Sequence, residues 1–201
     1  KSYRGDGGSL GQATFNGMHN LAIAPDDSVY IADSWNHSIR RVDARGRIKT
    51  FAGTGKAGFG GDGGPAAKAQ FNYIMCITLN PSGEKLHVAD LKNRRIREID
   101  LKSDKVRTIA GNGQRGVPKD GAKATEAPLV DPRAVCSDTA GNVYVLERGG
   151  HALRVVRLDG RIYTVAGNGE KGNSDGRGSA ARFNGPKHIC ADPAGNIYVA
   201  D

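Results

Sequence analysis

The sequence predicts an all-β protein made of repeated four-stranded antiparallel sheets. Its 201 residues include 29 glycines, about twice the usual share, whereas aromatic residues make up only 6%. One motif recurs four times along the chain, and each copy holds short β-rich segments separated by turn residues. Sheets repeated at a fixed period indicate the blades of a β-propeller, which stack around a central channel.

The four copies begin at Phe15, Phe71, Leu129 and Phe183, which are 56, 58 and 54 residues apart. The first reads FNGMHNLAIAPDDSVYIAD and the last FNGPKHICADPAGNIYVAD. The repeat divides the chain into an incoming glycine-rich loop over 1–14, blade repeats over 15–70, 71–128 and 129–182, and half of a fourth repeat over 183–201.

Four strands are expected in the first copy, at 19–24, 29–32, 39–43 and 48–52. The inner strands, such as 21–23, are apolar on both faces, so we expect them to be covered on each side. The third strand mixes charged and apolar residues, which is typical of a half-exposed strand nearer the rim. A parallel β-helix has much shorter coils, and a two-sheet sandwich has no such regular repeat.

The length has a consequence for closure of the ring. A propeller has roughly four to eight blades, and even four units of this size need about 228 residues. We therefore expect an open array of about 3.5 blades, cut from a longer protein whose missing blades are needed for closure. The alternative is a complete chain that assembles with copies of itself.

Several motifs resemble those of a known family. They are Asn36-His37-Ser38-Ile39, the strand endings at Asp33, Asp90 and Asp201, and the loop openings Ala-Gly-Thr-Gly and Ala-Gly-Asn-Gly. These motifs resemble NHL repeats, particularly the long-loop bacterial type, over essentially the whole chain. The resemblance implies a propeller that most often has six blades and that usually serves in protein interaction.

A carboxylate ends the second predicted strand of every copy, and asparagine follows it in the first two; these structural repeat positions are Asp33, Asn36, Asp90, Asn93, Glu147 and Asp201. Each carboxylate is expected to cap the turn and to form a hydrogen bond with the Asn or His that follows in that turn. Because the group recurs in every copy, we interpret it as part of the scaffold. The third copy departs from the pattern with Glu147 and Gly150-His151-Ala152, so its turn is expected to differ.

Two motifs that suggest chemistry are better explained by the repeat. The pattern GxGxxG occurs at 53–58, 111–116 and 167–172, but turn residues rather than a helix follow it. These segments are interpreted as blade-connecting loops that need positive φ. The pattern GxSxG at 7–11 aligns with ordinary repeat sequence at 63–67 and is interpreted as coincidence.

Each glycine-rich loop carries one aspartate before a glycine, at Asp6, Asp62, Asp120 and Asp175. An Asx-type turn is the expected role. Calcium binding is the alternative, although one aspartate per loop supplies few of the six to eight oxygens that the ion takes.

Function is expected where the repeat symmetry breaks, at the start of the innermost strands. Basic side chains at the channel mouth are His19, Arg133, Lys187 and His188. They would suit a carboxylate, a phosphate or an acidic loop of a partner, and the alternative is a solvated rim with no ligand. His19 and His188 are too few ligands for zinc, so no metal and no other cofactor is predicted. Cys76, Cys136 and Cys190 are interpreted as small buried hydrophobic residues without a disulfide.

We therefore expect a non-catalytic scaffold that binds a protein or ligand through its loop face and channel mouth. A metal-dependent lactonase-like or lyase-like propeller enzyme is one alternative, and an RNA-binding NHL domain is the other, since the net charge is +8. Arginines on the third strands and their turns are interpreted as a solvated rim: Arg40, Arg41, Arg94, Arg95, Arg97, Arg154 and Arg157. No apolar run is long enough to span a bilayer, residues 1–8 show no signal-peptide pattern, and the compartment stays open.

Overall fold

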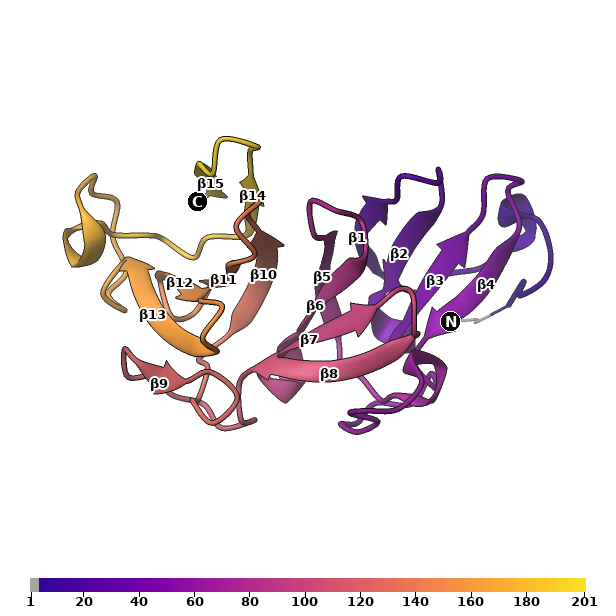
Figure 1. Cartoon of the computed structure of the whole chain (residues 1–201), viewed down its shortest axis with the longest axis horizontal. Helices are drawn as coiled ribbons and strands as arrows, with labels where there is room; N and C mark the ends of the chain where they lie inside the picture. Colours follow the sequence, from indigo (N-terminus) through magenta and orange to yellow (C-terminus); the bar gives the residue numbers. More distant parts are fainter. Residues whose placement is uncertain (1–3) are drawn as a thin grey trace.

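The structure is a computed structural model that describes residues 4–201 and consists mainly of antiparallel β-sheets (Figure 1). The first sheet contains β1 (Met18–Ile23), β2 (Val29–Asp33), β3 (Ser38–Val42) and β4 (Ile48–Ala52), and the second contains β5 (Ile74–Leu79), β6 (Lys85–Asp90), β7 (Arg95–Asp100) and β8 (Lys105–Ala110). The third contains β10 (Pro132–Ser137), β11 (Val143–Glu147), β12 (Ala152–Val156), β13 (Arg161–Ala166) and the short β9 (Ala122–Lys123). The fourth contains β14 (His188–Ala191) and β15 (Ile197–Ala200).

The helical elements of residues 4–201 are single 3-10 turns, namely η1 (Leu10–Gln12), η2 (Ser34–Asn36), η3 (Ala66–Lys68), η4 (Leu91–Asn93) and η5 (Gly178–Ala180). No helix in this part of the chain has the length and hydropathy needed to cross a bilayer. The strands predicted in the first copy differ from β1 to β4 by at most one residue at each end. The GxGxxG segment at 53–58 leads into loop and the three-residue η3, so no helix N-terminus is formed there to hold a phosphate.

Tight turns explain the up-and-down order of the strands. Between β3 and β4, the Asp43 carboxylate accepts hydrogen bonds from the backbone N–H groups of Arg45 and Arg47 at 3.0 and 2.9 Å. Gly46 supplies the positive φ of 74° that closes this hairpin. The chain therefore reverses locally, and strands that follow one another pair in every sheet, except that β9 pairs with β13.

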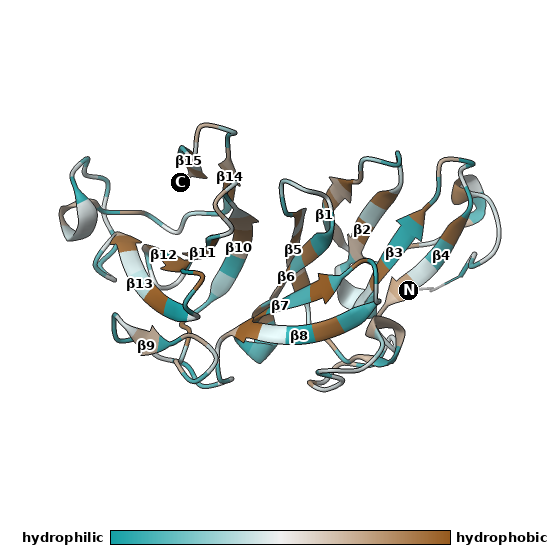
Figure 2. Ribbon diagram, in the orientation of Figure 1, coloured by the Kyte–Doolittle hydropathy of each residue, from teal (hydrophilic) through white to brown (hydrophobic). Residues whose placement is uncertain are grey.

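The sheets pack on one another through apolar faces, and strongly hydrophobic segments lie in the strands (Figure 2). The first two sheets share a buried cluster that includes Ala32, Ile39, Phe71, Ile77 and Leu86. A second cluster joins the second, third and fourth sheets and includes Ile96, Val135, Val145, Leu146 and Ile189. Each contact between neighbouring sheets is therefore stabilised by hydrophobic burial.

The innermost strands of the four sheets surround a common centre. Leu21, Ile77, Val135 and Ile189 come from β1, β5, β10 and β14, and they line one cavity of about 540 Å³. Asn20 Nδ2 lies 3.1 Å from His188 Nε2 across this centre, although 168 residues separate them. The all-β propeller fold predicted from the repeat is therefore confirmed.

The expectation that the inner strands are covered on both faces is wrong for β1. Leu21 is 57% exposed and Ile23 is 64% exposed, whereas Ile77 on β5 is buried. The sheet of β5 lies between two others, whereas that of β1 packs against only one neighbouring sheet among the described residues. One face of β1 therefore stays open.

The glycine-rich loops form an outer edge on the sheets, which the sequence did not predict. Gly7 N–H donates to Ile48 O at 2.8 Å, and Gly63 N–H donates to Val106 O at 2.8 Å. In the third sheet the loop forms β9, which pairs with β13. Each of these three loops thus covers the outermost strand of the sheet that follows it, which protects an otherwise free edge. Residues 1–3 of the predicted loop 1–14 lie outside the described residues.

Candidate functional site

The carboxylate at the end of the second strand connects two parts of each repeat. Asp33 Oδ1 accepts the Asn16 backbone N–H at 2.8 Å, and its Oδ2 accepts the Asn36 side-chain N–H at 2.9 Å. In the fourth copy, Asp201 accepts the Asn184 backbone N–H at 2.7 Å. These bonds fix the start of the inner strand against the turn that follows the second strand.

Asp90 has the same role in the second blade and is fully buried. It accepts the Asn72 backbone N–H and the Asn93 side-chain N–H, both at 2.8 Å. Burial raises the pKa of Asp90 to about 6, although these bonds and the nearby Arg97 act in the opposite direction. A group held by this many donors is part of the scaffold rather than a free ligand.

The departure in the third copy has a steric explanation. Glu147 accepts the Val130 backbone N–H at 2.5 Å and the Arg154 Nε–H at 2.9 Å. A Cβ added at Gly150 would lie only 2.9 Å from the Glu147 Cβ. The longer glutamate therefore fills the space that the Asp and Asn pair occupies in the other blades, and glycine makes room for it.

The expectation of solvated arginines is wrong for Arg40, Arg97 and Arg154, which are buried. Arg40 Nη2 donates to Asp6 Oδ1 at 2.6 Å, and its Nη1 lies 3.6 Å from Asp33 Oδ2. Arg40 thus bridges the loop carboxylate and the strand carboxylate of the first blade. The strand alternation places such a side chain inside, where paired carboxylates offset its desolvation.

Asp6, Asp62 and Asp120 bind threonines of the outer strands instead of closing the expected Asx-type turns. Asp6 Oδ2 accepts the Thr50 hydroxyl at 2.7 Å, and Asp62 accepts the Thr108 hydroxyl at 2.7 Å. Asp62 also accepts Arg97 Nη2 at 2.6 Å. A guanidinium is therefore the cation beside these carboxylates, and the contacts attach each loop to its outer strands.

The predicted mouth residues lie at the start of the inner strands, with His19 on β1, Arg133 on β10, His188 on β14 and Lys187 directly before it. Arg133 is partly buried and the other three are exposed. His188 meets Asn20 across the channel. No described contact joins the four to one another, and only His188 lines the central cavity, so their common site at the channel mouth stays a prediction.

The three cysteines line the central cavity from successive inner strands. Cys76 and Cys136 are buried, and burial raises the pKa of these thiols to about 11 and about 12. Cys190 is exposed, contrary to the expectation of burial, and all three are free thiols. Among residues 4–201, no group of three or more His, Cys, Asp or Glu side chains could hold a metal ion.

An aromatic cluster beside the mouth was not predicted as a site. The Trp35 and Tyr73 rings meet edge to face at 4.6 Å, and the His19 ring lies 5.5 Å from Tyr73. Trp35 is 49% exposed. The signal in the sequence is Tyr73 itself, which stands where the first and fourth copies have glycine.

Comparison with known proteins identifies the family of the chain. No family model matches it. SUPPRESSOR OF QUENCHING 1 from Arabidopsis thaliana, described as chloroplastic, is 32% identical over 159 residues, which are 77% of this chain and 15% of that protein. NHL repeat-containing protein 2 from Homo sapiens is 30% identical over 199 residues, which are 87% of this chain and 27% of that protein. This chain belongs to the NHL-repeat family.

The NHL chain spans only part of the proteins that it resembles. An auxiliary nutrient binding protein from Bacteroides thetaiotaomicron matches with a TM-score of 0.67 and 20% identity, covering 90% of this chain and 44% of that one. A streptogramin B lyase matches with a TM-score of 0.63 and 15% identity, covering 94% and 49%. At these identities the likeness shows the fold alone. The long-loop bacterial subtype and the six-bladed ring stay predictions.

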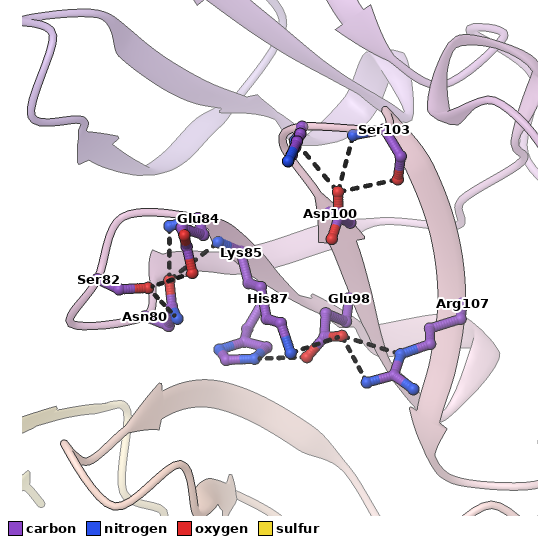
Figure 3. Close-up of polar contacts among 10 residues, drawn as sticks. Asn80, Ser82, Glu84, Lys85, His87, Glu98, Asp100, Ser103 and Arg107 are labelled. Carbon is purple, nitrogen blue, oxygen red and sulfur yellow. Dashed lines mark hydrogen bonds and ion pairs between the residues drawn. The ribbon is translucent and has the colours of Figure 1, made fainter.

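The second NHL blade carries a polar row across β6, β7 and β8, in which His87 and Glu98 are buried and Arg107 is exposed (Figure 3). His87 Nε2 lies 3.1 Å from Glu98 Oε2, and Arg107 Nε donates to Glu98 Oε1 at 2.9 Å. Lys85 Nζ lies 3.7 Å from the same carboxylate. The equivalent positions in the first blade are Tyr30, Arg41 and Lys49, so this row breaks the repeat. Because His87 Nδ1 is buried, the row is suited to stabilising the blade rather than to taking a proton from a substrate.

Acid should destabilise the fold through Glu98. Burial alone would raise its pKa, but hydrogen bonds from His87 and Arg107 and the Arg107 charge lower it from 4.5 to about 2. The unfolded chain binds more protons between these values, so this stabilisation is complete above 4.5 and is lost as the pH falls toward about 2. Urea unfolding across this range should show a larger loss for the wild type than for Glu98→Gln. Equal losses in both proteins would contradict this role.

Proposed function

We propose that this NHL propeller is a non-catalytic binding module that takes an anionic ligand or an acidic partner surface at its channel mouth. The observation that carries the proposal is the convergence of the inner strands on one cavity of about 540 Å³, with His188 and Asn20 meeting across it. His19 and Arg133 lie at the start of inner strands, and Lys187 directly precedes the inner strand β14. We infer that the positive groups of Arg133 and Lys187 border one opening together with His19 and His188, which would suit an anion.

The contacts of the repeated carboxylates support a binding function over acid–base catalysis. Asp33, Asp90 and Glu147 are each held by a backbone N–H group and lie against a buried arginine. A carboxylate engaged in this way stabilises the blade and is not free to act on a substrate.

The relatives support a binding function but do not indicate the ligand. NHL-repeat and propeller homologues suggest a binding or scaffold role. The solved neighbours include both a nutrient binding protein and a lyase, so the fold alone does not choose between binding and catalysis. The basic mouth is what favours a ligand of negative charge.

Citrate provides a small multivalent anion as a probe of the mouth. Titration into isotope-labelled protein should shift the amide signals of Asn20, Arg133 and His188 in a saturable way. Removing two charges together with Arg133→Ala and Lys187→Ala should weaken binding by about tenfold or more. Lys49→Ala, on the outer strand β4, is the control and should leave binding unchanged. Absence of saturable shifts at the mouth, or equal weakening by the control, would overturn the proposal.

A further inference from the structure

Tyr73 adopts a backbone conformation that the repeat otherwise gives to glycine. The third position of the repeat is Gly17 in the first copy and Gly185 in the fourth, with φ of 65° and 74°. Tyr73 occupies the same position with φ of 67°, in the left-handed region that bulky side chains rarely adopt. A strained residue of this kind points to a function when its surroundings hold it in place.

The surroundings of Tyr73 hold both its backbone and its ring. Its N–H donates to His37 Nδ1 at 3.1 Å. Burial and the Lys92 charge lower the pKa of His37, which keeps Nδ1 free to accept this bond at neutral pH. The ring contacts Trp35 and His19 edge-on at 4.6 and 5.5 Å. The Tyr73 ring is thus fixed against the Trp35 indole.

The chain is adapted to present Trp35 at the surface. A Cβ at Gly17 would lie 1.8 Å from Trp35 Cδ1, so only glycine leaves room for the indole. The Trp35 backbone N–H donates to Asn16 O at 3.0 Å. Trp35 as a residue stays 49% exposed. A rigid exposed tryptophan offers a large apolar contact area at low entropic cost.

Positive charge borders the two rings. Lys92 Nζ lies 5.3 Å from the Tyr73 ring centre and 6.0 Å from that of Trp35. Burial lowers the pKa of Arg133, and the charge of the nearby Arg148 lowers it further. Asp131 offsets part of this charge. The neighbourhood therefore holds more cations than carboxylates.

We propose that Trp35, Tyr73 and Lys92 form a docking surface for a partner protein with an acidic segment that contains an apolar side chain. The apolar side chain packs on the Trp35 indole, and carboxylates of the segment pair with Lys92 and with Arg133. The inference rests on the proposed function and names the partner for it. Tryptophan, tyrosine and arginine are the residues that most often dominate the binding energy of protein interfaces.

The geometry favours a protein segment over a small ligand or RNA. A small ligand needs a site that encloses most of its surface, whereas Trp35 lies half open. Single-stranded RNA needs successive free ring faces along a basic groove. Here the Tyr73 ring is already engaged by Trp35, His19 and Lys92, so a single indole is left for contact.

A random copolymer of glutamate and phenylalanine supplies both features of the partner. Trp35 is the only tryptophan, so its fluorescence reports binding at this surface directly. The copolymer should change that fluorescence in a saturable way and bind about tenfold more tightly than polyglutamate. A copolymer of lysine and phenylalanine should not bind, and polyuridylate should bind more weakly.

Variants then separate this surface from general electrostatics. Tyr73→Gly removes the ring and also relieves the backbone strain, so the melting temperature should stay the same or rise while copolymer affinity falls about tenfold. Lys92→Glu should weaken binding about tenfold, whereas Lys49→Glu, with the same change in net charge, should alter it less than about twofold.

Four outcomes would overturn the inference. Two concern the probes, namely no copolymer binding or tighter binding of polyuridylate than of the copolymer. The other two concern the variants, namely equal effects of Lys92→Glu and Lys49→Glu, or a lower melting temperature of Tyr73→Gly without a change in affinity. If copolymer binding survives these variants but is lost in the Arg133→Ala and Lys187→Ala protein, the inference fails and the proposed function stands. If citrate also fails to bind the wild type, the proposed function fails as well.

Discussion

Arg97→Ala should lower the free energy of unfolding by about 3–5 kcal/mol, because it leaves a buried carboxylate without its cation. Arg97 and Asp90 are both fully buried, and Arg97 Nη1 lies 3.5 Å from Asp90 Oδ2. Arg97 Nη2 also donates to Asp62 Oδ1 at 2.6 Å, which attaches the glycine-rich loop to the second blade. Urea unfolding monitored by circular dichroism measures the loss.

Two further variants test the cause of this loss. Lys123→Ala removes an ion pair with Glu126 in which the side chains are 64% and 70% exposed, and it should cost less than about 1 kcal/mol. Combining Arg97→Met with Asp90→Asn should recover part of the stability, because no buried charge is left unpaired. If Arg97→Ala costs no more than Lys123→Ala, the buried bridge does not stabilise the blade.

Gly111→Ala should lower the free energy of unfolding by about 3 kcal/mol, because strain and a backbone clash act together. Gly111 has φ of 88°, and an added Cβ would lie 2.1 Å from Arg94 O. That oxygen belongs to the backbone and cannot rotate away. Gly53 and Gly167 open the same loop in the neighbouring copies, with closest approaches of 2.5 and 2.2 Å.

Gly63→Ala is the matched control for this effect. Gly63 has φ of 80° and has no atom within 4 Å of the added Cβ, so only the backbone strain remains. Its cost should be about 1 kcal/mol. Equal losses in Gly63→Ala and Gly111→Ala would show that the close approach to Arg94 has no effect on stability.

The repeat period made the arrangement of the blades predictable. Leu21, Ile77, Val135 and Ile189 occupy equivalent positions of the repeat, and equivalent positions of stacked blades meet at one axis. Burial of Arg40 beside the partly exposed Arg41 was not predictable from composition. Neighbours on a strand face opposite sides, and the loop partner of Arg40 lies 34 residues away.

The place of the basic residues at the start of the inner strands could also be predicted from the repeat. The aromatic cluster could not, since Trp35 and Tyr73 lie in different repeats and meet only when blades stack. The replacement of glycine by Tyr73 was visible in the alignment of the copies. The structural effect of this replacement could not be predicted, because it depends on the φ of 67° at Tyr73 and on the space that Gly17 leaves for the Trp35 indole.

Stacking of the innermost strands around one axis is most directly tested between β1 and β14. Asn20 Nδ2 and His188 Nε2 lie 3.1 Å apart in the fold. A nuclear Overhauser effect between the Asn20 side-chain amide protons and the His188 ring protons is therefore expected. A spectrum in which the His188 ring shows contacts only within its own sheet, and none with Asn20, would contradict the common centre.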